Sequence, residues 1–340
     1  METHEITLEY KASTDDEKKI FAYLTNNRTF FVYNGEIDYF FDKKIIKILK
    51  QSDASENLVF FLTTPGGDPD SAYKLSRYLQ QNYKKFSLAV LGACKSAGTL
   101  FALGAHEVIM NSEGEFGPLD VQLFRPDEFM NRTSGLTISQ SLSYIGNKAF
   151  ETFENVFLGI RKRSGGVITT TTAADIASSV VTGIYSPITA KIDPLTVGEM
   201  QRSLEVAVHY GIRLGADERI VQHLAKNYPS HSFVIDSEEA QGLFNNVRAP
   251  NVAEQVLIKH IEHVLMQEFK FEPFSIINRK PTAFIIKLSE MTEEVSDDPE
   301  THNKEIELGN ESAVIRRCDE DRNETDEKGE SGSESEELRN

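Results

Sequence analysis

Two short apolar runs in the first third of the chain each end in a glycine-bearing turn, and each turn leads into a helix-compatible segment. Residues 58–62 precede the turn Thr64–Asp68 (TPGGD), and residues 88–91 precede the turn Cys94–Thr99 (CKSAGT). A third turn, Gly114–Asp120 (GEFGPLD), follows another such run. This alternation predicts an α/β fold with a mostly parallel sheet and right-handed crossovers.

Apolar periodicity predicts the remaining elements. Strands are expected at 30–33, 58–63, 87–92 and 107–110, and helices at 37–49, 69–83, 96–103, 145–163, 172–181, 196–208, 216–227, 236–243 and 251–268. We expect an N-terminal extension (1–28), a main domain with a helical C-terminal portion (29–289), and an acidic tail (290–340) whose composition is typical of disorder.

The charge of this 340-residue chain is concentrated at its end. Nineteen acidic and six basic residues lie between Glu290 and Asn340, so −13 of the total −17 falls there and −4 is left for residues 1–289. A nucleic-acid partner is not expected, because phosphate binding needs a basic surface. We also expect no cofactor, since no cluster has metal-ligand spacing and no phosphate-binding loop is present.

Two cysteines, Cys94 and Cys318, do not form a disulfide framework, and Cys94 is expected to pack in the core. No apolar run approaches the roughly 20 residues that span a bilayer. The first residues show neither the basic nor the apolar region of a signal peptide. A cytoplasmic protein without an integral membrane segment is the expectation.

Ser96 is the candidate nucleophile, because it lies where a strand ends and a helix begins. The N–H of Ala97 can point at a developing oxyanion there, with the helix dipole behind it. Gly66 and Gly67, at the end of the neighbouring strand, can supply a second donor. Either turn alone is more often a tight β-to-α connection with a capping serine, but the two together, in adjacent units, favour a site.

A serine needs a base, and no histidine lies between His106 and His209. Lys148 is the better candidate, because it opens an apolar helical segment that contains Phe150, Phe153 and Phe157. Burial against such a face lowers the pKa of a lysine and can make its neutral amine a general base. Taken alone, however, a lysine near the start of a helix is most often a solvated surface residue.

Several motifs in combination resemble the serine dehydrogenase proteinase family, which consists of Clp-fold serine proteases related to signal peptide peptidase A and to archaeal membrane-associated peptidases. The resemblance covers about residues 30–250. Its motifs are Thr64–Asp68, Lys95–Thr99, Gly104–Met110, Gly117–Gln122 and Tyr228–Asp236.

The resemblance implies a Clp/crotonase-like spiral of ββα units, a homo-oligomer, and hydrolysis of protein or peptide substrates through an acyl-enzyme. Related peptidases use a Ser/Lys dyad whose lysine precedes a helix ending in Ser-Gly. The position of Lys148 before Ser164-Gly165 is similar. Carried over, Ser96 is the nucleophile, Lys148 the base, and Gly67 and Ala97 the oxyanion donors. Many relatives carry a membrane anchor that is not found in this sequence.

Three further residues are possible supports of the site, namely Asp68, Asp120 and His231. We expect Asp68, with Asp70, to cap a helix, Asp120 to fix its turn, and His231 to have a structural role. Two other functions stay open: an enzyme of acyl-coenzyme A thioesters on the same fold, in which Ser96 is dispensable, and a non-catalytic scaffold whose acidic tail binds partners.

Overall fold

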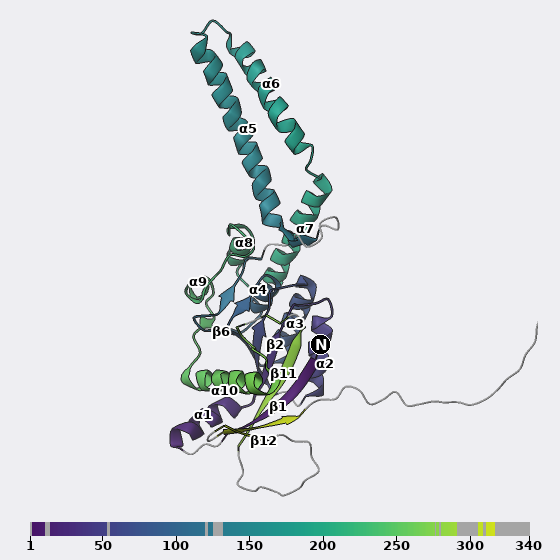
Figure 1. The fold of residues 1–340 in the computed structure, drawn as a ribbon, viewed down its shortest axis with the longest axis vertical. Helices are drawn as coiled ribbons and strands as arrows, with labels where there is room; N and C mark the ends of the chain where they lie inside the picture. Colours follow the sequence, from purple (N-terminus) through teal and green to yellow (C-terminus); the bar gives the residue numbers. More distant parts are fainter. Residues whose placement is uncertain are drawn as a thin grey trace, which may run out of the picture.

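A nine-stranded, mostly parallel sheet forms the centre of the computed structural model (Figure 1). The structure describes residues 2–10, 14–52, 55–119, 122–124, 132–275, 277–278, 280–290, 305–308 and 311–316. In spatial order the strands are β10 (Val247–Arg248), β6 (Glu107–Met110), β4 (Lys85–Val90), β3 (Asn57–Thr63), β2 (Arg28–Asn34), β11 (Thr282–Glu290), β1 (Glu2–Tyr10), β13 (Glu311–Arg316) and β12 (Glu305–Leu308).

The helices of the described residues surround this sheet and extend beyond it (Figure 1). They are α1 (Asp15–Thr25), α2 (Phe41–Gln51), α3 (Pro69–Asn82), α4 (Ala97–Ala102), α5 (Gly135–Arg163), α6 (Thr170–Thr189), α7 (Pro194–Arg213), α8 (Glu218–Lys226), α9 (Ser237–Leu243) and α10 (Val252–Phe269). The predicted helices are therefore present, although α5 begins ten residues before the expected position.

The predicted parallel pairing of the three β-then-α units is confirmed. Phe31 of β2 lies opposite Phe60 of β3, Phe60 lies opposite Leu88 of β4, and Leu88 lies opposite Val108 of β6, all in parallel register. Parallel strands place their carboxyl ends at one edge of a sheet. The turns after β2, β3 and β4 consequently meet at the same edge.

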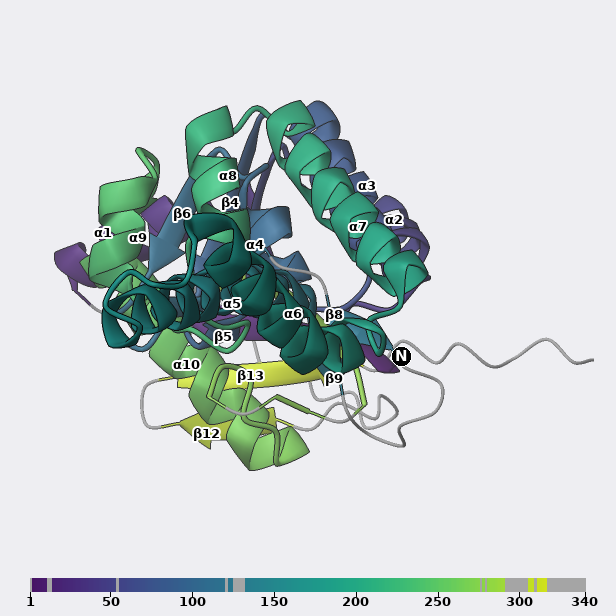
Figure 2. The ribbon, with the colours of Figure 1, turned by 90° about the horizontal axis from the view of Figure 1, so that it is seen from above.

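Side chains alternate between two cores, one on each face of the sheet. Along β3, Phe60 and Leu62 pack with residues of α2, α3, α4 and α8, whereas Val59 and Phe61 pack against α10. Figure 2 shows α2 and α3 on one side and α10 on the other. The period of two in an extended strand produces this division, and burial on both faces explains why the strands are apolar throughout.

A second layer of short strands continues the chain beyond the carboxyl edge. Ile37 pairs with Gly67, and Thr64 pairs with Cys94 in β5 (Ala93–Cys94). β5 pairs in turn with β7 (Glu115–Phe116). Each unit therefore runs from a long strand through a short strand into a helix. This is the ββα unit that the resemblance implies.

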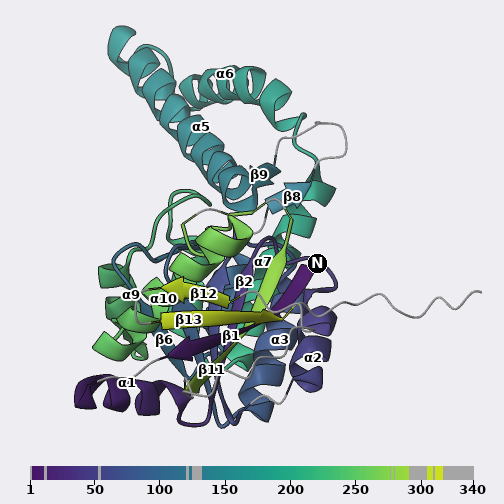
Figure 3. The ribbon, with the colours of Figure 1, turned by 60° about the horizontal axis from the view of Figure 1, so that its bottom comes forward.

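The polar N-terminal segment lies inside the sheet rather than beside it. β1 pairs in parallel with β11 along its whole length and antiparallel with β13 (Figure 3). Ile6 and Leu8 are almost fully buried, and α1 contributes Leu24 to the same core. The division of the chain at residues 28 and 290 stays a prediction, but segments from both outer parts are strands of the central sheet.

α5 and α6 form a hairpin that projects from the body, and α7 returns the chain to it (Figure 1). We call this hairpin, residues 135–189, the arm. A hydrogen bond of 3.0 Å joins the hydroxyls of Thr152 and Tyr185 across it. Among the described residues, no helix has the length and apolar character needed to cross a bilayer.

Candidate active site

Ser96 has a backbone conformation that side chains rarely adopt. It follows β5 and immediately precedes α4, with φ of 51° and ψ of −111°. A non-glycine residue at such angles costs about 1–3 kcal/mol and persists only where surrounding structure enforces it. Ser96 forms no cap with its own side chain. A strained serine at a strand-to-helix turn is also the arrangement found in nucleophile elbows.

Gly66 lies directly against Ser96. A Cβ added to Gly66 would be 2.8 Å from the Ser96 Cβ and 3.4 Å from the Ala97 nitrogen, and its φ is +109°. Any side chain here would therefore displace Ser96. The pairing of Thr64 with Cys94 sets this contact, because it places the residues two positions further on, Gly66 and Ser96, side by side.

The N–H of Gly66 is already used, since it donates to Thr64 Oγ1 (3.1 Å). Gly67 differs. Its neighbours bond to Ile37, which donates to the Gly66 carbonyl (2.9 Å) and accepts from the Asp68 N–H (2.7 Å). Successive N–H groups of an extended segment point to opposite sides. The Gly67 N–H is therefore not used by Ile37, and Gly67 follows Gly66, which lies against Ser96.

Ala97 supplies a second unused donor. As the first residue of α4 it has no carbonyl one turn earlier in the helix to bond. Within the part of the chain that the structure describes, neither the Ala97 N–H nor the Gly67 N–H donates a hydrogen bond. Unused N–H donors near a serine are the kind of group that an oxyanion hole needs.

Thr99 and Lys95 hold this turn in place. Thr99 Oγ1 donates to the carbonyls of Gly117 (2.8 Å) and Cys94 (3.2 Å) and accepts from the Gly117 N–H. Lys95 Nζ donates to the Phe116 carbonyl (3.1 Å) and pairs with Glu115 (3.1 Å). Although Lys95 is next to Ser96 in the chain, the described bonds of its ammonium group are therefore with residues of β7.

Cys94 is not a nucleophile in this arrangement. Its side chain is fully buried, and burial raises the pKa of the thiol well above its ordinary range. A protonated thiol reacts poorly. The predicted packing role of Cys94 is confirmed.

Lys148 is not buried as expected. It lies on the arm with 44% of its side chain exposed, and its Nζ pairs with Glu151 Oε2 at 2.6 Å. The hydrogen bond and charge of Glu151 raise the pKa of Lys148. The expected lowering of that pKa by burial is therefore wrong for the chain alone. Among the described contacts of Lys148 and Ser96, none joins the two residues. The role of Lys148 as base stays a prediction.

The three supporting candidates have different positions. Asp68 caps α3, as predicted, by accepting from the Ser71 N–H (2.9 Å), whereas Asp70 accepts a hydrogen bond from Tyr210 (2.8 Å) instead. His231 is half-buried and lies four residues before Ile235, whose backbone pairs with Phe116. Asp120 lies outside the described residues.

No group of three or more His, Cys, Asp or Glu side chains is arranged to hold a metal ion among the residues that the structure describes. The sequence did not single out Thr64, Ile37 or Thr99 as parts of the site. Their roles depend on backbone pairing between turns far apart in the chain. Thr64 and Thr99 do lie within the two turn motifs, which is the signal that could have identified them.

The sequence matches no protein-family model and no curated protein. Solved structures do show similarity. Two are mutants of the 1510-N membrane-bound stomatin-specific protease, one with serine replaced by alanine and one with lysine replaced by alanine in complex with a substrate peptide. They are 14% and 15% identical, cover 76% of this chain and 96% and 91% of their own, and have TM-scores of 0.37 and 0.36.

A third structure, from Acinetobacter baumannii and described as an enoyl-CoA hydratase/isomerase, is 14% identical over 56% of this chain and 84% of its own, with a TM-score of 0.22. Identities and TM-scores this low carry no information on the reaction. The chemistry of this chain therefore has to be argued from its own residues.

Proposed function

We propose that the chain is a serine peptidase in which Ser96 attacks a peptide carbonyl and Lys148 is the general base. The observation that carries this proposal is the strained backbone of Ser96 beside two unused N–H donors, those of Gly67 and Ala97. A binding module has no need for a strained serine at an oxyanion hole. A hydrolase that forms an acyl-enzyme needs a serine nucleophile and oxyanion donors close together.

In the proposed reaction, Ser96 Oγ bonds to the carbonyl carbon as its proton passes to the neutral amine of Lys148. The oxyanion accepts hydrogen bonds from Gly67 and Ala97. Collapse of the tetrahedral intermediate breaks the C–N bond, and the proton returns to the departing amine. Water, deprotonated by Lys148, then hydrolyses the ester and regenerates Ser96.

This role requires Lys148 to leave Glu151 and to approach Ser96 in a drier environment. Desolvation lowers the pKa of a lysine, and loss of the Glu151 carboxylate lowers it further. The arm that carries Lys148 projects from the body (Figure 1). We infer that the reactive state forms when an arm, from the same chain or from a second copy, is placed over the carboxyl edge.

The test is labelling with a fluorophosphonate probe, which reacts with activated serines, together with cleavage of casein. Ser96→Ala is expected to abolish both. Ser164→Ala, at the far end of α5, is the matched control and is expected to keep both. Labelling that persists in Ser96→Ala would contradict the proposal.

An enzyme of acyl-coenzyme A thioesters would use the same two N–H donors without Ser96. Equilibrium binding of coenzyme A separates the two functions. Tight binding of coenzyme A, together with an unreactive Ser96, would replace the peptidase proposal. If the protein neither reacts with the probe nor binds coenzyme A, the non-catalytic alternative is favoured.

A further inference from the structure

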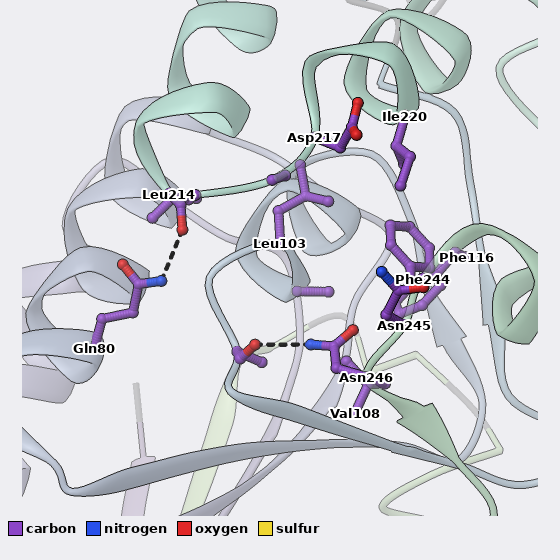
Figure 4. Close-up of a pocket in the computed structure, with 14 residues that line it drawn as sticks. Gln80, Leu103, Val108, Phe116, Leu214, Asp217, Ile220, Phe244, Asn245 and Asn246 are labelled. Carbon is purple, nitrogen blue, oxygen red and sulfur yellow. Dashed lines mark hydrogen bonds between the residues drawn. The ribbon is translucent and has the colours of Figure 1, made fainter.

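A cavity of about 320 Å³ lies at the end of α4 opposite to Ser96 (Figure 4). Its walls come from the C-terminal end of α4, the turn between α7 and α8, and the segment between α9 and β10. Pockets that hold small molecules have volumes of about 300–1,000 Å³. None of the described residues that we propose for catalysis lines it.

The cavity exists because small residues face large apolar ones. Ala102, Ala105 and Ala216 leave the space, while Leu103 and Phe116 provide part of its apolar surface. Figure 4 shows Leu103, Phe116, Phe244 and Ile220 around the opening. This surface suits the body of an apolar molecule.

The polar groups of the cavity come mainly from two adjacent asparagines. The Nδ2 of Asn246 donates to the Ala105 carbonyl (2.9 Å), and this bond fixes the orientation of the amide. Among the described residues, nothing donates to Asn246 Oδ1, and nothing bonds the side chain of Asn245 beside it (Figure 4). A ligand with an N–H or O–H group would satisfy the free oxygen of Asn246.

The described lining holds no cation that would attract an anion. Asp217 is the one ionisable residue among the described residues of the wall, and no lysine or arginine is present there. Hydrogen bonds from the side chain and backbone of Arg219 lower the pKa of Asp217, so this carboxylate stays ionised. An acceptor-only anion cannot donate to the Asn246 oxygen, whereas an amide or hydroxyl group can.

We propose that this cavity is a binding site for an uncharged small molecule with an apolar body and an amide or hydroxyl group that donates to Asn246 Oδ1. The inference does not rest on the proposed peptidase activity, because it concerns binding alone.

Benzamide and benzoate test the proposal as a matched pair, because they have nearly the same shape and differ in the NH₂ and O⁻ groups. Binding is measured by titration of the methyl resonances of Leu103 and Ile220 in the full-length protein. Benzamide is expected to shift these resonances and to bind at least tenfold more tightly than benzoate. Equal affinity, or no binding of benzamide up to its solubility limit, would overturn the proposal.

Two variants locate the site. Ala216→Leu fills the cavity from the turn between α7 and α8 and is expected to abolish benzamide binding. Asn245→Ala removes a side chain that no described residue holds, so the variant is expected to fold normally. It is expected to weaken binding several-fold, because the Asn245 amide lines the cavity beside Asn246 and can donate to the carbonyl oxygen of benzamide. Ser96→Ala is expected to bind benzamide unchanged. If Asn245→Ala and a folded Ala216→Leu both keep the wild-type affinity, the cavity is not the site.

Discussion

The carboxyl edge of the sheet and the arm differ in how firmly their residues are held. At the edge, Ser96 follows a strand that is paired with Thr64, and its Cβ lies against Gly66. On the arm, Lys148 is exposed, and its described ion pair is with a residue one turn away on its own helix. The two halves of the proposed dyad thus differ in their described contacts. In the proposal, the surroundings of the nucleophile are already formed, whereas the position of the base depends on where the arm is placed.

The largest expected effect comes from removing the proposed base on the arm. Lys148→Met is expected to lower the rate of peptide cleavage by about 10²–10⁴, the contribution typical of a general base. It should not change the melting temperature, because an exposed ion pair contributes little stability. The matched control is Lys162→Met in the last turn of α5. Full activity of Lys148→Met would refute the dyad while leaving Ser96 as a possible nucleophile.

The pH dependence of cleavage tests how Glu151 acts on the proposed base. Glu151 raises the pKa of Lys148, so it favours the protonated form, which cannot act as a base. Cleavage is therefore expected to rise with pH as Lys148 loses its proton. Glu151→Gln removes the charge that holds the proton and should shift this rise to lower pH. A pH–rate profile of both proteins measures the effect, and an unchanged profile would show that Glu151 does not act on the base.

At the edge, the corresponding change is Gly66→Ala. The added methyl would meet Ser96 Cβ at 2.8 Å, and alanine is strained at a φ of +109°. We expect cleavage to fall by about 10²–10³, as when an oxyanion-hole donor is lost, and the free energy of unfolding to fall by about 1–3 kcal/mol. Probe labelling and urea unfolding test this, and wild-type values in both would show that the contact is not tight.

The body also has a charge network that the arm lacks among the described residues. Burial acts to raise the pKa of Glu107, but hydrogen bonds from Arg248 and Lys85 hold it at about 2, below its ordinary 4.5. A lowered carboxyl pKa stabilises the fold above pH 4.5, and this contribution is lost as the pH falls from 4.5 toward 2. Urea unfolding across that range should show a steeper loss in the wild type than in Glu107→Gln.

The smallest expected effect is at Gly159 on the arm. Nothing lies within 4 Å of an added Cβ there, and the residue is inside α5. Gly159→Ala should therefore stabilise the helix by about 0.5–1 kcal/mol, which is opposite in sign to Gly66→Ala. Thermal unfolding measures it, and a destabilised Gly159→Ala would mean that the arm packs against another surface in solution.

Much of the edge could be predicted from sequence, because its signals are local. Apolar runs followed by Gly66-Gly67 and by Ser96-Ala97 identify two strand ends, and the parallel arrangement follows from the intervening helices. The sequence could not predict which of the two glycines has a bonded N–H and which has an unused one. It depends on the pairing of Ile37 with Gly67, which no local pattern encodes.

The environment of Lys148 could not be predicted for a related reason. A helical period of 3.6 shows which side chains share a face, but not what that face meets. Phe150, expected on a buried face, is 65% exposed. β1 was missed although Ile6 and Leu8 alternate with polar residues, because its partner β11 lies about 280 residues further along the chain.

The pairing of β1 with β11 has a consequence for biosynthesis. During synthesis β1 leaves the ribosome about 280 residues before its parallel neighbour β11 exists. Ile6 and Leu8 stay uncovered during that time, while the β2–β6 units can already pack with their helices. Newly made chains should therefore pass through a state in which the unit bearing Ser96 is formed and its amino terminus is still an unpaired strand, open to chaperones that bind extended apolar segments.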